Sequence, residues 1–260
     1  MDRNVLFAIG LTLIAGAATG IGALTALFAK KENTKLLAAS LGFSAGVMIF
    51  VSMIEIFSQA RGYLAIGADS KMGYLYAAAA FFAGVVIIGA IDWIVPSAEG
   101  DIGNLTSNRS EALSRMGMLT ALAIAIHNFP EGMVTFTSAL KNPSLGVAVC
   151  LAIAIHNIPE GIATAMPIFY SEGKRGKAFF ISFLSGIAEP IGAVIGYLIL
   201  RPFLNDMLFG ILFAAIAGIM VFISIEELLP MARNYDKGKL TIIGFVCGMA
   251  VMALSLIMLA

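Results

Sequence analysis

The sequence predicts an all-α integral membrane protein whose eight transmembrane helices form an inverted repeat. Three observations predict this fold class: an apolar composition, eight apolar stretches of spanning length, and matching segments that would run in opposite directions. Of the 260 residues, 60% are hydrophobic and 12% are charged, whereas soluble domains have about 45–50% and about 25%. So little charge cannot cover a water-soluble protein of this size, and we therefore expect a lipid bilayer around the chain.

The charge balance and the cysteines exclude several other classes of protein. The 16 basic and 16 acidic side chains give a formal net charge of zero, so no basic excess is available to bind nucleic acid. A disordered chain is excluded because it needs low hydrophobicity and high net charge. Cys150 and Cys247 both lie in apolar runs and are expected to be free thiols, which excludes a disulfide-stabilised domain.

Eight apolar stretches are each long enough to cross a bilayer, which takes about 20 residues. In chain order they are roughly Val5–Ala29, Leu36–Ser58, Tyr74–Val95, Met116–Ala139, Leu145–Phe169, Ala178–Leu200, Met207–Leu229 and Leu240–Ala260. The first is too long for a signal peptide. The connections are short, and only Pro96–Arg115 is expected to be a flexible loop. Residues 1–260 are therefore expected to form one polytopic transmembrane domain.

The positive charges of the loops predict the orientation, because cytoplasmic loops carry an excess of Lys and Arg. The N-terminus and the loops after the even-numbered spans hold five, namely Arg3, Arg61, Lys71, Lys141 and Arg201. The loops after the odd-numbered spans hold eleven, namely Lys30, Lys31, Lys35, Arg109, Arg115, Lys174, Arg175, Lys177, Arg233, Lys237 and Lys239. We expect the second set to be cytoplasmic, with both termini outside the plasma (inner) membrane.

The fourth and fifth spans contain nearly the same segment. Leu122–Gly132 reads LAIAIHNFPEG and Leu151–Gly161 reads LAIAIHNIPEG, with ten of eleven positions identical. Because the two spans are adjacent in the chain, they cross the membrane in opposite directions. We call the shared motif HNxPEG.

Two further matches link the two halves of the chain. In spans 2 and 7, Ala45–Glu55 reads AGVMIFVSMIE and Ala217–Glu227 reads AGIMVFISIEE. A fainter match pairs Gly16–Ala23 of span 1 with Gly186–Ala193 of span 6. Spans 1–3 would then be related to spans 6–8, and span 4 to span 5, by an axis in the membrane plane. Such inverted repeats are typical of transporters, whose substrate site lies near the midplane between the repeats.

Each HNxPEG motif directs several metal-binding side chains to one side of its helix. In span 4, His127, Asn128 and Glu131 share a face, because residues three and four apart are neighbours on a helix. The equivalent residues of span 5 are His156, Asn157 and Glu160. His127 and His156 are the only histidines of the chain, which favours a shared site over two unrelated polar contacts.

The acidic residues within the spans require an interaction that offsets their burial. Glu131, Glu160 and Glu189 would each cost about 2.5–3.5 kcal/mol at the bilayer centre. Two imidazoles, three carboxylates and two amides at one place predict a site for a divalent cation. Imidazole with carboxylate suits Zn²⁺, Fe²⁺, Mn²⁺ or Co²⁺ better than Ca²⁺ or Mg²⁺. Any one of these side chains could alternatively be a partner in a helix–helix hydrogen bond.

Three further acids are candidates for a transport pathway. Glu55 lies near the predicted outer mouth as an entry ligand, and Glu226 and Glu227 lie near the inner mouth as exit ligands; the alternative is that they are ordinary interfacial acids. Met48 is either a soft metal ligand or packing in the helix bundle.

On these motifs the chain resembles the ZIP (Zrt/Irt-like protein) family of metal-ion transporters, most closely its bacterial zinc-uptake branch. The resemblance covers nearly the whole chain and is strongest at His127–Gly132, His156–Gly161, Ala188–Gly192 and Glu226–Pro230. It implies eight spans, both termini outside, a homodimer, and import of Zn²⁺ as a substrate and not a cofactor, with Fe²⁺, Mn²⁺, Co²⁺ or Cd²⁺ as further substrates. Many relatives carry a His-rich loop between spans 3 and 4, which this chain lacks.

The resemblance also implies a binuclear metal centre. One ion would be held by His127, Glu131, His156, Glu160 and Met48. The second would be completed by Asn128, Asn157 and Glu189, with Glu131 and Glu160 bridging the two ions. The bundle of spans 1, 4, 5 and 6 would rock against the remaining spans to alternate access to the centre.

Three other functions compete with a metal importer. A cation or proton exchanger with an inverted repeat would not need His127 or His156. An intramembrane metallohydrolase would need its H-E-x-x-H motif, which the chain lacks, so we do not expect an enzyme. A metal-binding receptor would need an extramembrane portion that could signal, and no connection is large enough.

Overall fold

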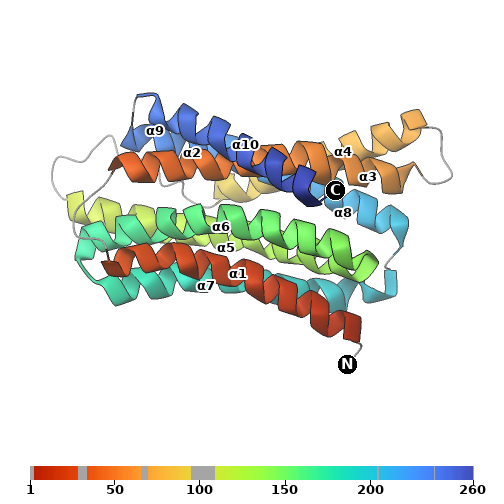
Figure 1. Ribbon diagram of the computed structural model, residues 1–260, viewed down its shortest axis with the longest axis horizontal. Coiled ribbons are helices and arrows are strands. Elements are labelled where there is room, and N and C mark those ends of the chain that lie inside the picture. The colour runs from red at the N-terminus through yellow and green to blue at the C-terminus, as the bar shows by residue number, and fades with distance from the viewer. Residues whose placement is uncertain are drawn as a thin grey trace.

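The computed structural model describes residues 3–28, 34–65, 70–94, 109–203, 205–236 and 238–259, which form helices joined by short connections. The elements labelled in Figure 1 follow one another in the order α1 (Arg3–Phe28), α2 (Thr34–Phe50), the π-helical η1 (Val51–Ile56), α3 (Phe57–Leu64), α4 (Ser70–Ile94), α5 (Arg109–Lys141), α6 (Pro143–Glu172), α7 (Arg175–Leu200), the 3-10 turn η3 (Arg201–Phe203), α8 (Asp206–Ile223), the π-helical η4 (Ser224–Leu228), α9 (Leu229–Tyr235) and α10 (Leu240–Leu259). No strand occurs among these residues, so the predicted all-α class is confirmed.

Seven helical stretches of the described chain are long and apolar enough to cross a membrane. They are Arg3–Phe28, Thr34–Leu64, Lys71–Ile91, Pro143–Glu172, Arg175–Ile199, Asp206–Tyr235 and Leu240–Met258. Two of them run continuously through a π-helical segment: α2, η1 and α3 form one stretch, and α8, η4 and α9 form another. The 33-residue α5 is not among the seven, and the polar His127–Glu131 run lies in its middle.

The prediction of a flexible loop over Pro96–Arg115 is wrong for the C-terminal part of that segment. α5 already begins at Arg109, because the segment RSEALSR consists mainly of residues that favour a helix. Residues 96–108 of that loop lie outside the described residues.

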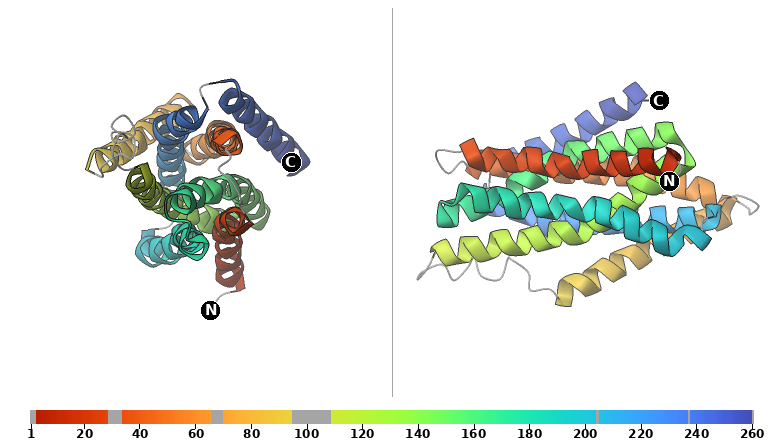
Figure 2. Two further views of the ribbon diagram at one scale, coloured as in Figure 1. Left: turned by 90° about the vertical axis from the view of Figure 1, so that its left-hand side faces the viewer. Right: turned by 90° about the horizontal axis from the view of Figure 1, so that it is seen from below.

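The helices separate into two groups. In the first, α1 packs against α6 and α7, and α5 packs against the same two helices. In the second, α2 packs against α10, and α8 packs against α3 and α4. The groups occupy the lower and upper halves of Figure 1 and separate in the same way in the end-on view of Figure 2. They meet where α2 contacts α6 and where α5 contacts α8, so the HNxPEG helices line the boundary between the groups.

Glycines bring the helices of the first group into backbone contact. A methyl group on Gly22 of α1 would overlap the carbonyl oxygen of Ile158 on α6, and one on Gly161 of α6 would overlap that of Thr19 on α1. Small residues at such crossings let helix backbones approach closely in membranes. The two helices are therefore held at a spacing that no larger residue would permit.

The crossing of α5 with α7 repeats this arrangement. A methyl group on Gly132 of α5 would overlap the carbonyl oxygen of Glu189 on α7, and one on Gly192 of α7 would overlap that of Phe129 on α5. The same kind of contact joins the helix pairs of the second group, at Gly46 with Phe245, Gly248 with Phe43, Gly218 with Phe81 and Gly84 with Ala215.

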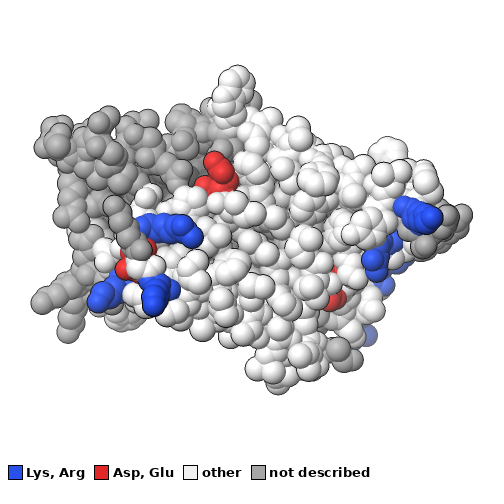
Figure 3. Space-filling view, turned by 90° about the horizontal axis from the view of Figure 1, so that it is seen from above, with Lys and Arg blue, Asp and Glu red and all other residues white. Residues whose placement is uncertain are grey.

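The outer surface is apolar along the length of the helices. Large side chains such as Val86, Leu198 and Ile257 are each about two-thirds or more exposed, at 68%, 68% and 73%. On the face drawn in Figure 3, Lys and Arg gather at the two ends and the surface between them is mostly uncharged. This distribution matches a hydrocarbon layer around the middle of the molecule.

Candidate metal centre

The two HNxPEG motifs face the interior of the first helix group. Asn128 and Glu131 on α5, with Asn157 and Glu160 on α6, are fully buried. His156 of α6 is also buried, whereas the side chain of His127 lies outside the described residues. Glu189 of α7 is buried as well, so six of the eight predicted metal ligands lie inside the bundle as polar side chains.

The side chains of Glu131 and His156 meet between α5 and α6. The Nε2 atom of His156 lies 3.4 Å from each carboxylate oxygen of Glu131. Both side chains are excluded from the surface. A carboxylate and an imidazole held this close without solvent can share a proton or bind one cation between them.

The two motif asparagines attach α5 and α6 to the neighbouring helices. Asn157 Nδ2 donates to the carbonyl oxygen of Ala15 on α1 at 3.0 Å and also to the Glu189 carboxylate on α7. Asn128 Nδ2 donates to the carbonyl oxygen of Ser185 on α7 at 3.2 Å. Because each amide uses its nitrogen for these contacts, its oxygen stays available, and both Oδ1 atoms are buried without a hydrogen-bond partner.

Glu189 is the third buried acid and lies among like charges. Its Oε1 accepts from Asn157, whereas its Oε2 is buried without a hydrogen-bond partner. The carboxylates of Glu131 and Glu160 lie close enough to repel it electrostatically. A bound cation would offset both the repulsion and the burial of the charges.

The described side chains do not yet surround a complete metal position. No group of three or more His, Cys, Asp or Glu among them is arranged to hold an ion. The contacts occur instead in pairs, His156 with Glu131 and Asn157 with Glu189. The predicted ligand set therefore stays a prediction, although these two pairs belong to one buried region.

The π-helical segments of α2–α3 and α8–α9 have matching bonds. In η1, the hydroxyl of Ser52 donates to the carbonyl oxygen of Met48 at 2.6 Å, and the amide of Phe57 donates to the carbonyl oxygen of Ser52. In η4 the corresponding residues are Ser224, Met220 and Leu229, with the hydroxyl bond at 2.7 Å. Single π-turns within α-helices are frequent at functional sites.

The predicted pathway acids lie within these two segments. Glu55 of η1 is partly buried and accepts a hydrogen bond from Gln59 Nε2 at 2.6 Å. In η4, Glu227 is partly buried and Glu226 is exposed. The structure thus places all three acids within π-helical segments, and their part in a pathway stays a prediction.

Met48 of α2 and the hydroxyl groups of Ser44 and Thr19 belong to the helices that pack against the HNxPEG motifs. The hydroxyl of Ser44 on α2 donates to the carbonyl oxygen of His156 at 3.4 Å, and Met48 lies buried one turn further along α2. Ser44 and Thr19 were not predicted from the sequence. Thr19 could have been found, because the match of Gly16–Ala23 with Gly186–Ala193 pairs it with Glu189.

Comparison with known proteins gives one consistent result. A family model described as ZIP Zinc transporter matches residues 104–256. The chain is 53% identical to a protein of Lysinibacillus sphaericus named Zinc transporter ZupT, with 100% of both chains covered. It is 52% identical to the protein of that name in Chlorobium chlorochromatii, with 99% of each covered, and 53% identical to that of Nitratidesulfovibrio vulgaris, with 99% and 98% covered.

Proposed function

Because this chain belongs to the ZIP zinc transporter family, we propose that it imports Zn²⁺ into the cytoplasm through a metal centre between α5 and α6. The chain is a transporter and not an enzyme, and zinc is its transported substrate and not a cofactor. Fe²⁺, Mn²⁺, Co²⁺ and Cd²⁺ would be further substrates, since imidazole and carboxylate ligands accept each of these ions.

The contact between Glu131 and His156 is the observation that carries this proposal. It joins the two HNxPEG motifs across the helix boundary at full burial. Charged groups in a membrane interior normally mark an ion pathway because their burial is costly.

The full centre would hold two ions. The first would be bound by Glu131, His156 and Glu160, together with His127 and Met48. The second would use Asn128, Asn157 and Glu189, with Glu131 and Glu160 shared by both ions. The unpartnered Oδ1 atoms of Asn128 and Asn157 and the unpartnered Oε2 of Glu189 support this second position.

We also propose eight spans related by an inverted repeat, with the whole chain as one transport domain. Equivalent contacts support the repeat: Asn157 donates to Ala15 on α1, and Asn128 donates to Ser185 on α7. The glycine crossings of α1 with α6 and of α5 with α7 are equivalent in the same way. Both ends of the chain lie toward the same end of the molecule (Figure 1), which favours an even number of spans.

The two helix groups provide a means of alternating access. α1, α5, α6 and α7 would move together, since glycine contacts hold them closely, while α2, α4, α8 and α10 would form the opposing scaffold. Glu55 would receive the ion on the outer side and Glu226 or Glu227 would accept it on the inner side. The loop charges favour both termini outside the plasma membrane, and the family resemblance favours a homodimer.

Zinc uptake into proteoliposomes tests the proposal. Glu131→Ala and Glu160→Ala should each abolish uptake, because the centre loses a shared ligand. Glu172→Ala is the matched control, since Glu172 lies at the end of α6 and pairs with Lys177; its uptake should match the unaltered protein. Undiminished uptake by both Glu131→Ala and Glu160→Ala would contradict the proposed site.

A further inference from the structure

Thr19 occupies the position on α1 that Glu189 occupies on α7. Gly161 of α6 lies against the carbonyl oxygen of Thr19, and Gly132 of α5 lies against that of Glu189. The residues one turn earlier also correspond, because the carbonyl oxygens of Ala15 and Ser185 each accept from a motif asparagine. The metal centre therefore has a carboxylate on one side and a hydroxyl at the equivalent place on the other.

The hydroxyl of Thr19 is not used by its own helix. On α1, Thr12 Oγ1 donates to the carbonyl oxygen of Ile9 at 2.8 Å, and Thr25 Oγ1 donates to that of Gly22 at 2.7 Å. Thr19 is fully buried, and its Oγ1 has no hydrogen-bond partner. A buried hydroxyl that forgoes this local bond loses the stabilisation of a hydrogen bond, so a ligand that supplies a partner would be favoured there.

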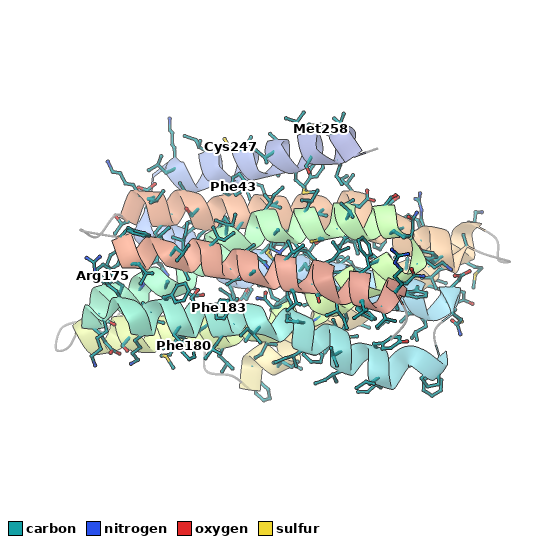
Figure 4. The ribbon with its side chains drawn as sticks, turned by 60° about the horizontal axis from the view of Figure 1, so that its bottom comes forward. Phe43, Arg175, Phe180, Phe183, Cys247 and Met258 are labelled. Atoms are coloured by element: carbon teal, nitrogen blue, oxygen red, sulfur yellow. The ribbon has the colours of Figure 1, made fainter. Side chains whose placement is uncertain are left out.

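The position of this hydroxyl is defined by α7. Thr19 Oγ1 lies 3.0 Å from where a Cβ of Gly186 would be, next to Ser185, whose carbonyl oxygen accepts from Asn128. On the next residue of α1, Gly20 lies against the ring of Phe183, which is labelled on α7 in Figure 4. Thr19 Oγ1 is therefore buried at the α1–α7 contact, beside Gly186, whose neighbour Ser185 binds the Asn128 amide.

We infer that Thr19 is a further ligand of the transported ion, giving its hydroxyl oxygen to the ion or to an ion-bound water on the side opposite Glu189. This inference rests on the proposed function and adds one residue to its centre. A neutral oxygen opposite a carboxylate makes the two sides of the centre unequal in charge. The ion would then be bound less tightly on the Thr19 side, which favours passage over retention.

A cysteine in place of Thr19 tests this geometry directly. The parent for the experiment is the full-length protein with Cys150→Ala and Cys247→Ala, reconstituted and first checked for zinc uptake. Co²⁺ is the probe, because it occupies zinc sites and gives a sulfur-to-metal charge-transfer band when a thiolate binds it. Thr19→Cys should show that band on Co²⁺ addition. Thr12→Cys is the matched control, since Thr12 is also buried on α1, and it should show none.

Uptake kinetics give a second readout. Thr19→Val removes the hydroxyl with little change in volume and should raise the KM for Zn²⁺ about fivefold, the effect of one lost hydrogen-bond-strength contact. Thr19→Ser keeps the hydroxyl and should stay within about twofold of the parent. Thr19→Cys should also shift competition toward the softer Cd²⁺ by about tenfold.

The outcomes separate this inference from the proposed function. If the parent binds Co²⁺ but Thr19→Cys gives no charge-transfer band, and Thr19→Val keeps the parental KM, the assignment of Thr19 is overturned while the centre stands. If the parent itself fails to bind Co²⁺ and Glu131→Ala retains uptake, both are overturned.

Discussion

Gly16 on α1 and Gly186 on α7 face each other so closely that a methyl group on either would overlap the carbonyl oxygen of the other. The contact is the same seen from either helix, and it lies one turn from Thr19 and Glu189 respectively. Reciprocal contact is expected where a two-fold relation passes between two elements. The contact therefore lies where the axis of the proposed inverted repeat is expected to pass.

This contact predicts the effect of a single methyl group. Gly16→Ala should lower the thermal stability and reduce uptake, because α1 and α7 must move apart at a cost of about 1–3 kcal/mol for overpacking. Gly10→Ala on the same helix meets nothing within 4 Å and should leave both unchanged. Melting in detergent and zinc uptake measure the two effects. Equal melting temperatures for Gly16→Ala and Gly10→Ala would refute the close crossing.

The π-turns predict a functional effect without a large loss of stability. Ser52→Ala and Ser224→Ala each remove a hydroxyl that bonds the preceding turn, so the local helix can return to α geometry and rotate Glu55 or Glu227. We expect a lower maximal uptake rate and a stability change of about 1 kcal/mol or less. Thr25→Val, which removes a similar bond on α1, is the control. Normal uptake in both serine variants would show that the π-turns have no part in transport.

The ion pair between Lys141 and Asp206 predicts a link between the helix groups at one end. Lys141 ends α5, Asp206 begins α8, and the ammonium lies 5.5 Å from the ring centre of Tyr63 on α3. Both charged side chains are more than a third exposed, so Asp206→Asn should alter stability by less than about 1 kcal/mol. Asp206→Asn should nevertheless change the uptake rate, because the two helix groups separate more readily at this end of α5 and α8 without the ion pair.

Charge exchange provides the check on that link. Lys141→Asp combined with Asp206→Lys should restore the parental rate that each single variant changes. Lys177→Gln is the control, since Lys177 pairs with Glu172 within the first helix group. If the change in uptake rate of the double variant equals the sum of the changes in the two single variants, the Lys141–Asp206 pair does not couple the helix groups.

The donor set predicts how competing ions and protons affect uptake. Zn²⁺ uptake should be reduced by Cd²⁺, Fe²⁺ and Mn²⁺ but little by Mg²⁺ or Ca²⁺. Carboxylate and imidazole must be deprotonated to bind metal, so lowering the pH should weaken binding and reduce uptake at subsaturating Zn²⁺. Competitive uptake at two pH values measures both effects. Strong inhibition by Ca²⁺ would contradict an imidazole-containing site.

Composition and hydrophobic length predicted the helices well, since the greater part of each predicted span lies within described helices. The main errors were at the ends, such as α5 beginning at Arg109, because polar residues continue a helix beyond the apolar region. Of the six polar side chains predicted from the HNxPEG motifs, the five that the structure describes are buried. The backbone partners of Asn128 and Asn157 were not predictable, since only the packing of the bundle selects these carbonyl oxygens on α7 and α1.

Two features of the site had no sequence pattern that would have predicted them. In a π-turn the backbone hydrogen bonds span five residues, whereas in an α-turn they span four. The residue types of Val51–Ile56 are compatible with both forms. The unbonded hydroxyl of Thr19 had no such pattern either, because Thr12 and Thr25 on the same helix both donate to a carbonyl oxygen three residues earlier.

The connection between α5 and α6 limits how the centre can deform. Only Asn142 separates the two helices, and its side chain accepts from the amides of Ser144 and Leu145 at the start of α6. Because the connection has only one residue, α5 cannot slide along α6 unless a turn of one helix unwinds. During the proposed rocking motion the two HNxPEG motifs should therefore move together and keep their relative depth, and any widening between them should begin at the ends of α5 and α6 that lie away from Asn142.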